Sequence, residues 1–469
     1  MTTKTIFIIV TRGFIVRNVL RSGVLGYLKD KNFKIVIFLL ADRETEIPMY
    51  LKKEFTGENV EVVAVREMVR GRLYQKIYRL FCKLSALLIY TESTWAYSQI
   101  GNVYNLSRNI FWAYLERALF SFFGRIKFLK RLVRFIDKNI FSGDYEEYAK
   151  FFDAYHPDLV FSTSIISKVD IVFMKEARKR GVKTVSMTKG WDHMAKLLFR
   201  FVPDKLIVQN NNLKEIAIKH QLISKEKVAT CGFPQFDWYR RREILLNRED
   251  FFRYLGLDPQ KRLIFFGSEG HWAPNDDKIV DDLLDFIKAG KLHKDCQLIV
   301  RPHFSDLKKN RFERFRGVSE IKVDDNITRS DFFNDTWDPS VEEVKLFVNS
   351  IYHSDMMVTV ASTLALDACC LNKPVIVVAY NALFNPKTGE DISHILYETN
   401  HYGEVLNTGA VDLVKNKERL LDSVNNYLLH PEHKAEERQI LLNKLCYRAD
   451  GDSSYRIFKV IEEVLNTTK

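Results

Sequence analysis

Short apolar runs alternate with helical patterns from the start of the chain. Runs rich in β-branched and aromatic residues predict strands, whereas apolar positions that recur every three or four residues predict helices. The predicted strands of the first half are Thr5–Val10, Lys34–Leu40, Val60–Val65, Leu159–Ser162, Thr184–Met187, Leu206–Gln209 and Val228–Thr230, with helices at Arg17–Lys29 and Lys175–Arg180. This alternation predicts a parallel, doubly wound sheet.

The alternation restarts after the charged stretch Trp238–Asp250. The second half has predicted strands at Arg262–Phe266, Gln297–Arg301, Met356–Val360 and Pro374–Val378, and helices at Asp277–Ala289, Val341–Tyr352, Leu364–Leu371 and Ser453–Leu465. The sequence therefore predicts an α/β fold of two Rossmann-like domains, 1–240 and 255–450, with a linker near 238–258 and a terminal helix in 451–469. Because ligands of such sheets bind beyond the carboxyl ends of the strands, we expect the site in a central cleft between the domains.

A helical, aromatic and basic insertion at about 74–141 interrupts the first domain. Between Arg108 and Lys138, eight Lys and Arg residues stand against the two acids Glu116 and Asp137. One interpretation is an amphipathic surface that lies on an anionic membrane. The other is a set of helices packed on their own domain with a solvated basic face. We expect no nucleic-acid partner, because no nucleic-acid-binding motif accompanies the charge.

Composition limits the class of protein. A chain of 469 residues suits two domains, and its 46% hydrophobic and 28% charged residues are typical of a globular protein. The net charge of +11 favours an anionic partner. The six cysteines form no CxxC pair, and neither a signal peptide nor a membrane span is evident. We therefore expect reduced cysteines and a cytoplasmic protein, or one bound peripherally to the inner face of the cell membrane.

Two predicted strand ends in the second half suit a phosphate-bearing ligand. Arg301 and His303 follow the strand that ends at Arg301, and both side chains can donate hydrogen bonds to an anionic leaving group. His303 could instead bond only to its own loop. Gly267 and Ser268 follow a neighbouring strand, where a glycine lets the backbone approach a phosphate closely.

A third junction adds hydroxyl groups. Ser362 and Thr363 stand where a predicted strand meets a helix, so their hydroxyls and the free N–H groups of the helix start suit an anion. Either residue could equally be a simple N-cap. Asp367 lies one turn later, where its carboxylate could accept hydrogen bonds from a ribose or sugar hydroxyl.

The catalytic candidates of the first half lie in the loop Thr188–His193. Transfer of a group to a hydroxyl needs a base that removes the proton of that hydroxyl. Asp192 is the first candidate for this base and His193 the second, although Asp192 could instead hold the loop through backbone hydrogen bonds. Lys189 and Arg12 are expected on the acceptor side.

Other acids have structural interpretations. Asp237 closes a rigid turn at the end of the first domain and is expected to be structural. The adjacent pairs Asp276–Asp277 and Asp324–Asp325 are expected in solvated loops, so they predict no metal site.

Three groups of residues resemble a known family. Lys189–Asp192, Pro203–Val208 and Gly232–Asp237 resemble the N-terminal domain of bacterial surface-polysaccharide glycosyltransferases of the GT-B fold. Ser354–Ala368 with Asn372–Ile376 resembles their donor-binding motif. Asp450–Ile457 resembles the ending shared with CDP-glycerol glycerophosphotransferases and UDP-N-acetylglucosamine 2-epimerases. The resemblance covers most of the chain from about residue 155.

The resemblance implies a nucleotide-sugar donor in 255–450 and a glycan or glycolipid acceptor in 1–240. It places Arg301, His303, Ser362 and Thr363 at the donor phosphates, and Ser453, Ser454 and Arg456 near the donor where the last helix crosses back. The order Pro302-His303-Phe304 departs from the His-Pro motif of the family. Because Asp367 is the only acid of its predicted helix, the resemblance favours inverting transfer, and it implies no metal or other cofactor.

Three alternatives remain open from the sequence. A CDP-glycerol-type glycerophosphotransferase and a sugar 2-epimerase are enzymes expected to share this fold. A non-catalytic scaffold that binds a membrane or nucleic acid through the basic insertion belongs to a different class. Convergence of Arg301, His303, Ser362 and Asp192 on one cleft would favour the enzymes.

Overall fold

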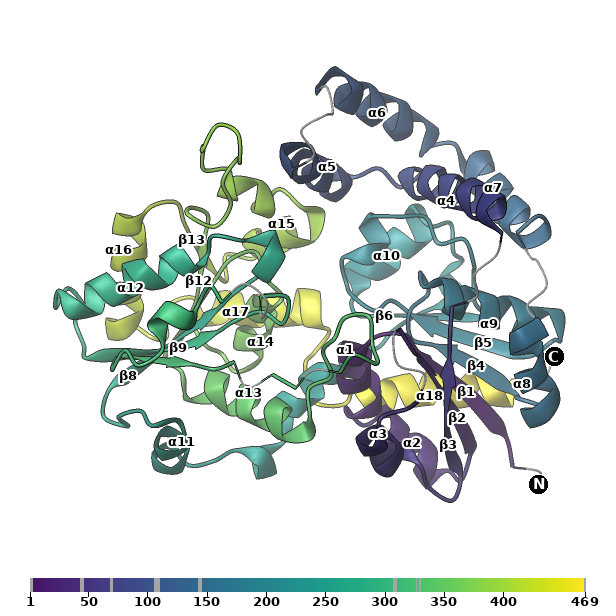
Figure 1. The fold of residues 1–469 in the computed structure, drawn as a ribbon, viewed down its shortest axis with the longest axis horizontal. Coiled ribbons are helices and arrows are strands. Elements are labelled where there is room, and N and C mark those ends of the chain that lie inside the picture. The colour runs from purple at the N-terminus through teal and green to yellow at the C-terminus, as the bar shows by residue number, and fades with distance from the viewer. Residues whose placement is uncertain are drawn as a thin grey trace.

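The computed structural model of the chain contains two parallel β-sheets, one in each half of the sequence (Figure 1). The structure describes residues 3–42, 46–67, 71–104, 110–141, 146–306, 310–325, 327–328 and 330–467. The strands of the first sheet lie within residues 5–230 and those of the second within 262–414. The predicted α/β fold with two Rossmann-like halves is confirmed.

The first sheet has the strand order β3-β2-β1-β4-β5-β6-β7. Its strands are β1 (Thr5–Val10), β2 (Lys34–Leu40), β3 (Val60–Val65), β4 (Leu159–Ser162), β5 (Lys183–Met187), β6 (Lys205–Val208) and β7 (Val228–Thr230). Every residue of β1 is buried, as expected for a central parallel strand covered on both faces. The order reverses between β1 and β4, and such a switch point opens a crevice at the carboxyl ends of the strands.

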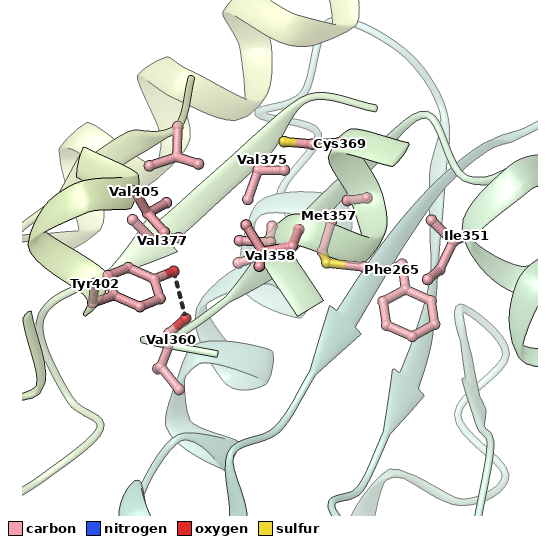
Figure 2. Packing of buried hydrophobic residues seen from close by; sticks show 14 of the residues in the cluster. Phe265, Ile351, Met357, Val358, Val360, Cys369, Val375, Val377, Tyr402 and Val405 are labelled. Atoms are coloured by element: carbon pink, nitrogen blue, oxygen red, sulfur yellow. Dashed lines mark hydrogen bonds between the residues drawn. The ribbon is translucent and has the colours of Figure 1, made fainter. Parts of the chain in front are cut away.

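The second sheet repeats this plan with the order β10-β9-β8-β11-β12-β13. Its strands are β8 (Arg262–Gly267), β9 (Cys296–Arg301), β10 (Ile321–Val323), β11 (Met356–Thr359), β12 (Val375–Val378) and β13 (Asp412–Val414). Figure 2 shows the apolar side chains of these strands packed together, with Tyr402 donating a hydrogen bond of 3.3 Å to the carbonyl oxygen of Val360. The short edge strands β10 and β13 were not predicted.

Helices cover the faces of both sheets (Figure 1). They are α1 (Gly13–Ile15), α2 (Val24–Asp30), α3 (Met49–Phe55), α4 (Arg72–Leu87), α5 (Glu92–Tyr104), α6 (Ile110–Phe123), α7 (Lys127–Asn139), α8 (Glu146–Tyr155), α9 (Lys168–Lys179), α10 (Asn211–Lys219), α11 (Arg248–Leu255), α12 (Asp277–Lys288), α13 (Val341–His353), α14 (Leu364–Cys370), α15 (Asn400–Leu406), α16 (Lys417–Leu429), α17 (Ala435–Leu441) and α18 (Ser453–Asn466). In the described residues, none is long and apolar enough to cross a bilayer. All six cysteines are unpaired, and five are buried.

One prediction about local structure was wrong. The single helix predicted over Arg17–Lys29 is broken, because Gly23 adopts a φ of 154° between a π-helical turn and α2. A Cβ at Gly23 would lie 3.2 Å from the Cβ of Ser454, so the close approach of α18 also favours glycine here. The predicted linker 238–258 lies between the two sheets and contains α11, with Phe251 and Phe252 fully buried.

The last helix, α18, returns to the first sheet. Ile457 and Ile461 are fully buried in the core of that sheet, and α18 packs against α2, β5 and β6. The carboxylate of Asp237 accepts hydrogen bonds from the backbone N–H groups of Ser453 and Ser454, at 3.0 and 2.8 Å. Asp237 therefore caps the start of α18, and its predicted structural role is confirmed.

The helical insertion, α4–α7, is attached to the first domain by polar contacts. Lys130 and Arg134 of α7 donate hydrogen bonds to backbone carbonyl groups of the domain, at 2.6–2.9 Å. Asp137, which is fully buried, pairs with Lys175 and Arg200, each at 2.7 Å. The inner face of α7 therefore combines these polar groups with Leu129 and Val133, which pack against the small apolar cluster of Leu88, Ile89 and Leu198.

A segment of the second half, residues 330–340, reaches into the first half, and we call it the clasp. Phe332 and Phe333 are buried in the core of the first sheet. Asp335 accepts hydrogen bonds from the backbone N–H groups of Gly13 and Phe14 at 2.9 and 3.2 Å. Arg21, almost fully buried, pairs with Asp338 at 2.7 Å, so an ion pair joins the two halves.

Replacing Arg21 tests how much the ion pair of the clasp contributes to the free energy of unfolding. Arg21→Ala leaves the buried carboxylate of Asp338 without its cation, so we expect the free energy of unfolding to fall by about 3–5 kcal/mol. The matched change Arg253→Ala removes an exposed pair with Asp250 and should lower it by less than about 1 kcal/mol. Denaturant titration measures both, and equal losses would show that the clasp pair contributes no more than a surface pair.

Candidate active site

A cleft of about 360 Å³ lies where the carboxyl ends of the two sets of strands face each other. Its wall from the first half includes the ends of β4, β5 and β6 and the segment around α1, and its wall from the second half includes the ends of β8 and β9 and the start of α14. Six sequence-predicted residues of the second half and three of the first line this cleft together, namely Ser268, Arg301, His303, Ser362, Thr363 and Asp367 with Lys189, Asp192 and His193.

The loop after β5 carries the catalytic candidates. Thr188 and Gln209 exchange two hydrogen bonds, each of 3.1 Å, which fix the start of the loop against β6. The Oδ1 atom of Asp192 lies 3.0 Å from Nδ1 of His193, while its Oδ2 atom pairs with Lys196. Asp192 and His193 therefore form a pair in which the carboxylate contacts one nitrogen of the imidazole ring.

The charge state of Asp192 follows from its neighbours. Burial by itself raises the pKa of Asp192, but the charges of His193 and Lys196 outweigh burial and hold this pKa well below its ordinary value. Asp192 is therefore an ionised carboxylate that takes up a proton poorly near neutral pH.

Trp191 joins this loop to the second half. Its indole N–H donates a hydrogen bond of 3.4 Å to the hydroxyl of Thr363, which directly precedes α14. Its ring packs edge-on against His401, with 5.1 Å between the ring centroids. The loop after β5 is thus held from both sides of the cleft.

The end of β9 places two predicted residues in the cleft. Arg301 pairs with Asp324, lies 4.8 Å above the ring of Phe347 and lines the cleft. Nδ1 of His303 lies 2.8 Å from the hydroxyl of Ser305. Burial lowers the pKa of His303 to about 4, so this imidazole is neutral at pH 7 and offers one N–H at most.

The loop after β8 is held by a buried polar network. Ser268 donates to Asp306 at 2.8 Å, and Asp276 accepts a hydrogen bond of 2.9 Å from the backbone N–H of Glu269. Arg311 pairs with both Asp276 and Asp306. Because the Ser268 hydroxyl already donates its hydrogen atom within this network, Ser268 fixes the shape of the loop and has no free hydroxyl donor for a ligand.

Gly270 of this loop has no tolerated substitute. Its φ is 65°, and a Cβ there would lie 2.2 Å from the hydroxyl oxygen of Ser305 and 2.7 Å from Nδ1 of His303. The glycine therefore lets the loops after β8 and β9 come together beside the cleft.

Glu269 is an acid of the cleft that the sequence predictions did not select. Burial raises its pKa to about 8, a hydrogen bond with Ser362 opposes this shift, and the charges of Asp276 and Asp192 add to it. Glu269 is therefore mostly protonated at pH 7, so it can donate a hydrogen bond and does not repel an anionic ligand.

Asp367 and Arg17 form the floor near α14. Tyr239 donates a hydrogen bond of 2.5 Å to Asp367, and burial raises the pKa of Asp367 to about 6. Burial lowers the pKa of Arg17, while the nearby Asp367 and Tyr239 oppose this effect. Arg17 also lies 5.0 Å above the ring of Trp337 in the clasp.

The structure does not bring every predicted residue to the cleft. Ser453 and Ser454 are buried at the cap made by Asp237, and Arg456 pairs with Asp450 at 2.9 Å. Gly267 lies beneath Leu364, and Arg12 is bonded to Asn334 of the clasp. Arg12 still acts on the site, because burial and the charge of Arg12 together lower the pKa of Lys189.

The prediction that Asp276 and Asp324 lie in solvated loops was wrong. Asp276 is fully buried with Arg311, and Asp324 is 4% exposed with Arg301. Their partners are distant in sequence, so no local pattern marked these acids as buried. In the described part of the chain, no cluster of three or more His, Cys, Asp or Glu side chains is arranged to hold a metal ion.

Comparison with known families identifies the chain. A profile of the family described as CDP-Glycerol:Poly(glycerophosphate) glycerophosphotransferase matches residues 182–463, more than half of the sequence. The chain belongs to this family. The resemblance drawn from the sequence motifs is thereby confirmed, and the family is one of transferases. A search of curated protein sequences finds no match.

Solved structures show the same fold at low identity. UDP-GlcNAc 2-epimerase from Neisseria meningitidis matches with a TM-score of 0.57 and 12% identity, over 99% of each chain. The enzyme of the same name from Methanocaldococcus jannaschii matches with a TM-score of 0.53 and 15% identity, over 98% of this chain and 100% of that one. The wall teichoic acid polymerase TagF matches with a TM-score of 0.51 and 13% identity, over 99% and 89%. These similarities show the two-domain GT-B fold.

The proton on Glu269 predicts a pH-dependent stability. The folded protein holds this proton up to a pH of about 8, whereas the unfolded chain loses it near the ordinary pKa of 4.5. The stabilisation is therefore complete below pH 4.5 and is lost as the pH rises through about 8. Glu269→Gln removes this titration. The Tm of the variant minus the Tm of the wild type should therefore rise as the pH increases from 4.5 to about 8.

The control for this experiment is Glu243→Gln, which changes an exposed glutamate. Its Tm difference from the wild type should not vary with pH. The other buried acids titrate in both proteins, so they cancel from each difference. A Tm difference for Glu269→Gln that stays constant from pH 4.5 to 8 would rule out a protonated Glu269.

Proposed function

We propose that the protein transfers glycerol phosphate, or a polyol phosphate of the same class, from a CDP-linked donor to a hydroxyl group of a cell-envelope polymer. One observation carries this proposal: a histidine–carboxylate pair and several cations share one cleft in a chain that belongs to the glycerophosphotransferase family. The similar polymerase TagF was solved with CDPG, which supports the donor class.

His193 is the proposed base, with Asp192 as its orienting partner. The low pKa of Asp192 keeps the carboxylate charged, so it accepts a hydrogen bond from Nδ1–H of His193 at 3.0 Å. This assignment leaves Nε2 of His193 free to accept the proton of the acceptor hydroxyl. The order of the two candidates is thus the reverse of the one expected from the sequence.

The cations of the cleft are proposed to stabilise the negative charge of the leaving group. The acceptor oxygen attacks the phosphorus that carries the polyol, the bond from that phosphorus to the CMP oxygen breaks, and CMP leaves with the electron pair. Arg17, Arg301 and Lys189 supply positive charge for this leaving group, and protonated Glu269 does not oppose it. We therefore propose transfer that needs no metal ion.

Glycosyl transfer from a nucleotide sugar, the first expectation from the sequence, is the alternative within the same cleft. It uses the same base and the same cations but releases a nucleoside diphosphate. Epimerisation of a UDP-sugar is the other alternative, and it needs no acceptor. The product formed from each donor distinguishes the three reactions.

A donor panel and a base variant test the proposal. With CDP-glycerol, CDP-ribitol, UDP-N-acetylglucosamine and GDP-mannose, we expect CMP release and polymer growth from the CDP-polyol class alone, with or without EDTA. His193→Ala should lower kcat by about 10²–10⁴-fold while the Kd for the donor changes little. His430→Ala, at an exposed histidine outside the cleft, should retain wild-type kcat. Full activity of His193→Ala, or transfer from none of the donors, would refute the proposal.

We further propose that α4 and α7 place the enzyme on an anionic bilayer. Their outward faces expose apolar side chains at helical spacing, namely Leu73, Ile77, Leu80 and Leu84 on α4 and Phe128, Leu132 and Phe135 on α7. Exposed basic residues flank both rows, namely Arg72, Lys76, Arg79, Lys83, Lys127, Arg131 and Lys138. Apolar rows bordered by cations match the core and headgroups of an anionic membrane.

The attachment of α7 supports this assignment. Its inner face is already held by the polar contacts of Lys130 and Arg134 and by the packing of Leu129 and Val133. The rings of Phe128 and Phe135 nevertheless remain exposed, so the packing of the helix on its own domain does not account for them. The sequence placed this surface at 108–138. Residues 108 and 109 lie outside the described part of the chain, and the surface proposed here also includes α4.

Vesicle binding tests this surface. Phe128→Ser combined with Phe135→Ser removes two large exposed rings, so binding to vesicles of phosphatidylglycerol and phosphatidylcholine should weaken by at least about tenfold. Tyr254→Ser, at an exposed ring of α11, is the control and should bind as the wild type does. Co-sedimentation measures all three proteins. Unchanged binding by the double variant, or binding to RNA in preference to vesicles, would contradict the proposal.

A further inference from the structure

The helical insertion is joined to both halves of the molecule through α5. The backbone N–H of Ser93 donates to the side-chain oxygen of Asn400 at 2.8 Å, and the backbone N–H of Asn400 binds the hydroxyl of Ser93 at 2.9 Å. Each residue thus caps the start of the other's helix, and Ser93 is fully buried. Figure 1 shows α5 beside α15 of the second half.

Tyr97 of α5 contacts one residue of each half. Its ring packs edge-on against Trp272, which follows β8, with 5.1 Å between the ring centroids. On the other side, the Nζ atom of Lys196 lies 4.0 Å from the centre of the Tyr97 ring. The second half therefore fixes the ring, and the ring provides a cation–π contact for a lysine of the first half.

That lysine is the one that pairs with Asp192. Lys196 holds Oδ2 of Asp192, while Oδ1 of the same carboxylate contacts His193. Thr91, just before α5, adds a hydrogen bond of 2.7 Å to the carbonyl oxygen of Ala195 in the same loop. A lysine side chain has several rotatable bonds, so without a partner its ammonium group samples many positions.

We propose that Tyr97 is a positioning residue for the Asp192–His193 pair, acting through Lys196. The ring fixes the ammonium group, the ammonium group fixes one carboxylate oxygen, and the other oxygen then orients the imidazole. The helical insertion would then help to position the catalytic pair, in addition to its proposed contact with the membrane. The inference rests on the proposed role of His193 as base.

Three variants and one combination test the chain of contacts. Tyr97→Leu removes the ring face and should lower kcat roughly tenfold with little change in the donor KM. Tyr97→Phe keeps the ring face and should retain most of the activity. Lys196→Met should lower kcat at least as much as Tyr97→Leu, and the double variant should be no worse than Lys196→Met alone, because both changes break the same link.

Matched controls separate positioning from general damage. Tyr114→Leu makes the same exchange at a largely exposed ring of the insertion and should keep wild-type kcat in a lipid-free assay. The Tm of each variant shows whether the fold is intact. A loss for Tyr97→Phe equal to that for Tyr97→Leu, or losses that multiply in the double variant, would overturn the inference. The proposed function fails separately, if the wild type transfers from no donor.

Discussion

The contact between Arg21 and Asp338 is the constraint on which the cleft depends, because it locks a loop of the second half into the first. Both halves form the cleft: the proposed base lies after a strand of the first sheet, and the cations come from both halves. Two domains joined only by a chain crossing would move relative to each other by default. Here a buried ion pair, the caps made by Asp335, and two buried rings of the clasp fix the facing strand ends at one separation.

The chemistry of the cleft follows from burying many ionisable groups at close range. Among the acids, Asp192 is held charged by its cations, while Glu269 keeps its proton because burial disfavours its charged form. This difference gives one carboxylate that can orient an imidazole and one carboxyl group that tolerates a phosphate. Burial and the nearby charge of Arg301 both disfavour the charged form of Arg17, and a bound anion would oppose this effect.

Much of this arrangement was predictable from the sequence. Central strands such as β1 and β8 are buried on both faces, so they appear as continuous apolar runs. The loop after β5 marked Asp192, and the end of β9 marked Arg301. The three-residue edge strands β10 and β13 were not recognised, although β7, of the same length, was predicted. The role of Glu269 depends on burial by distant segments, and the cap made by Asp237 placed the start of α18 away from the cleft, so neither could be deduced from local sequence.

The polar contacts on the inner face of α7 fix its rotation. Lys130 and Arg134 donate hydrogen bonds to backbone carbonyl groups of the domain, and Asp137 pairs with Lys175. Rotation of the helix about its own axis would hide Phe128 and Phe135 only by leaving those carbonyl groups without their donors. The apolar row stays on the outside even before any partner arrives.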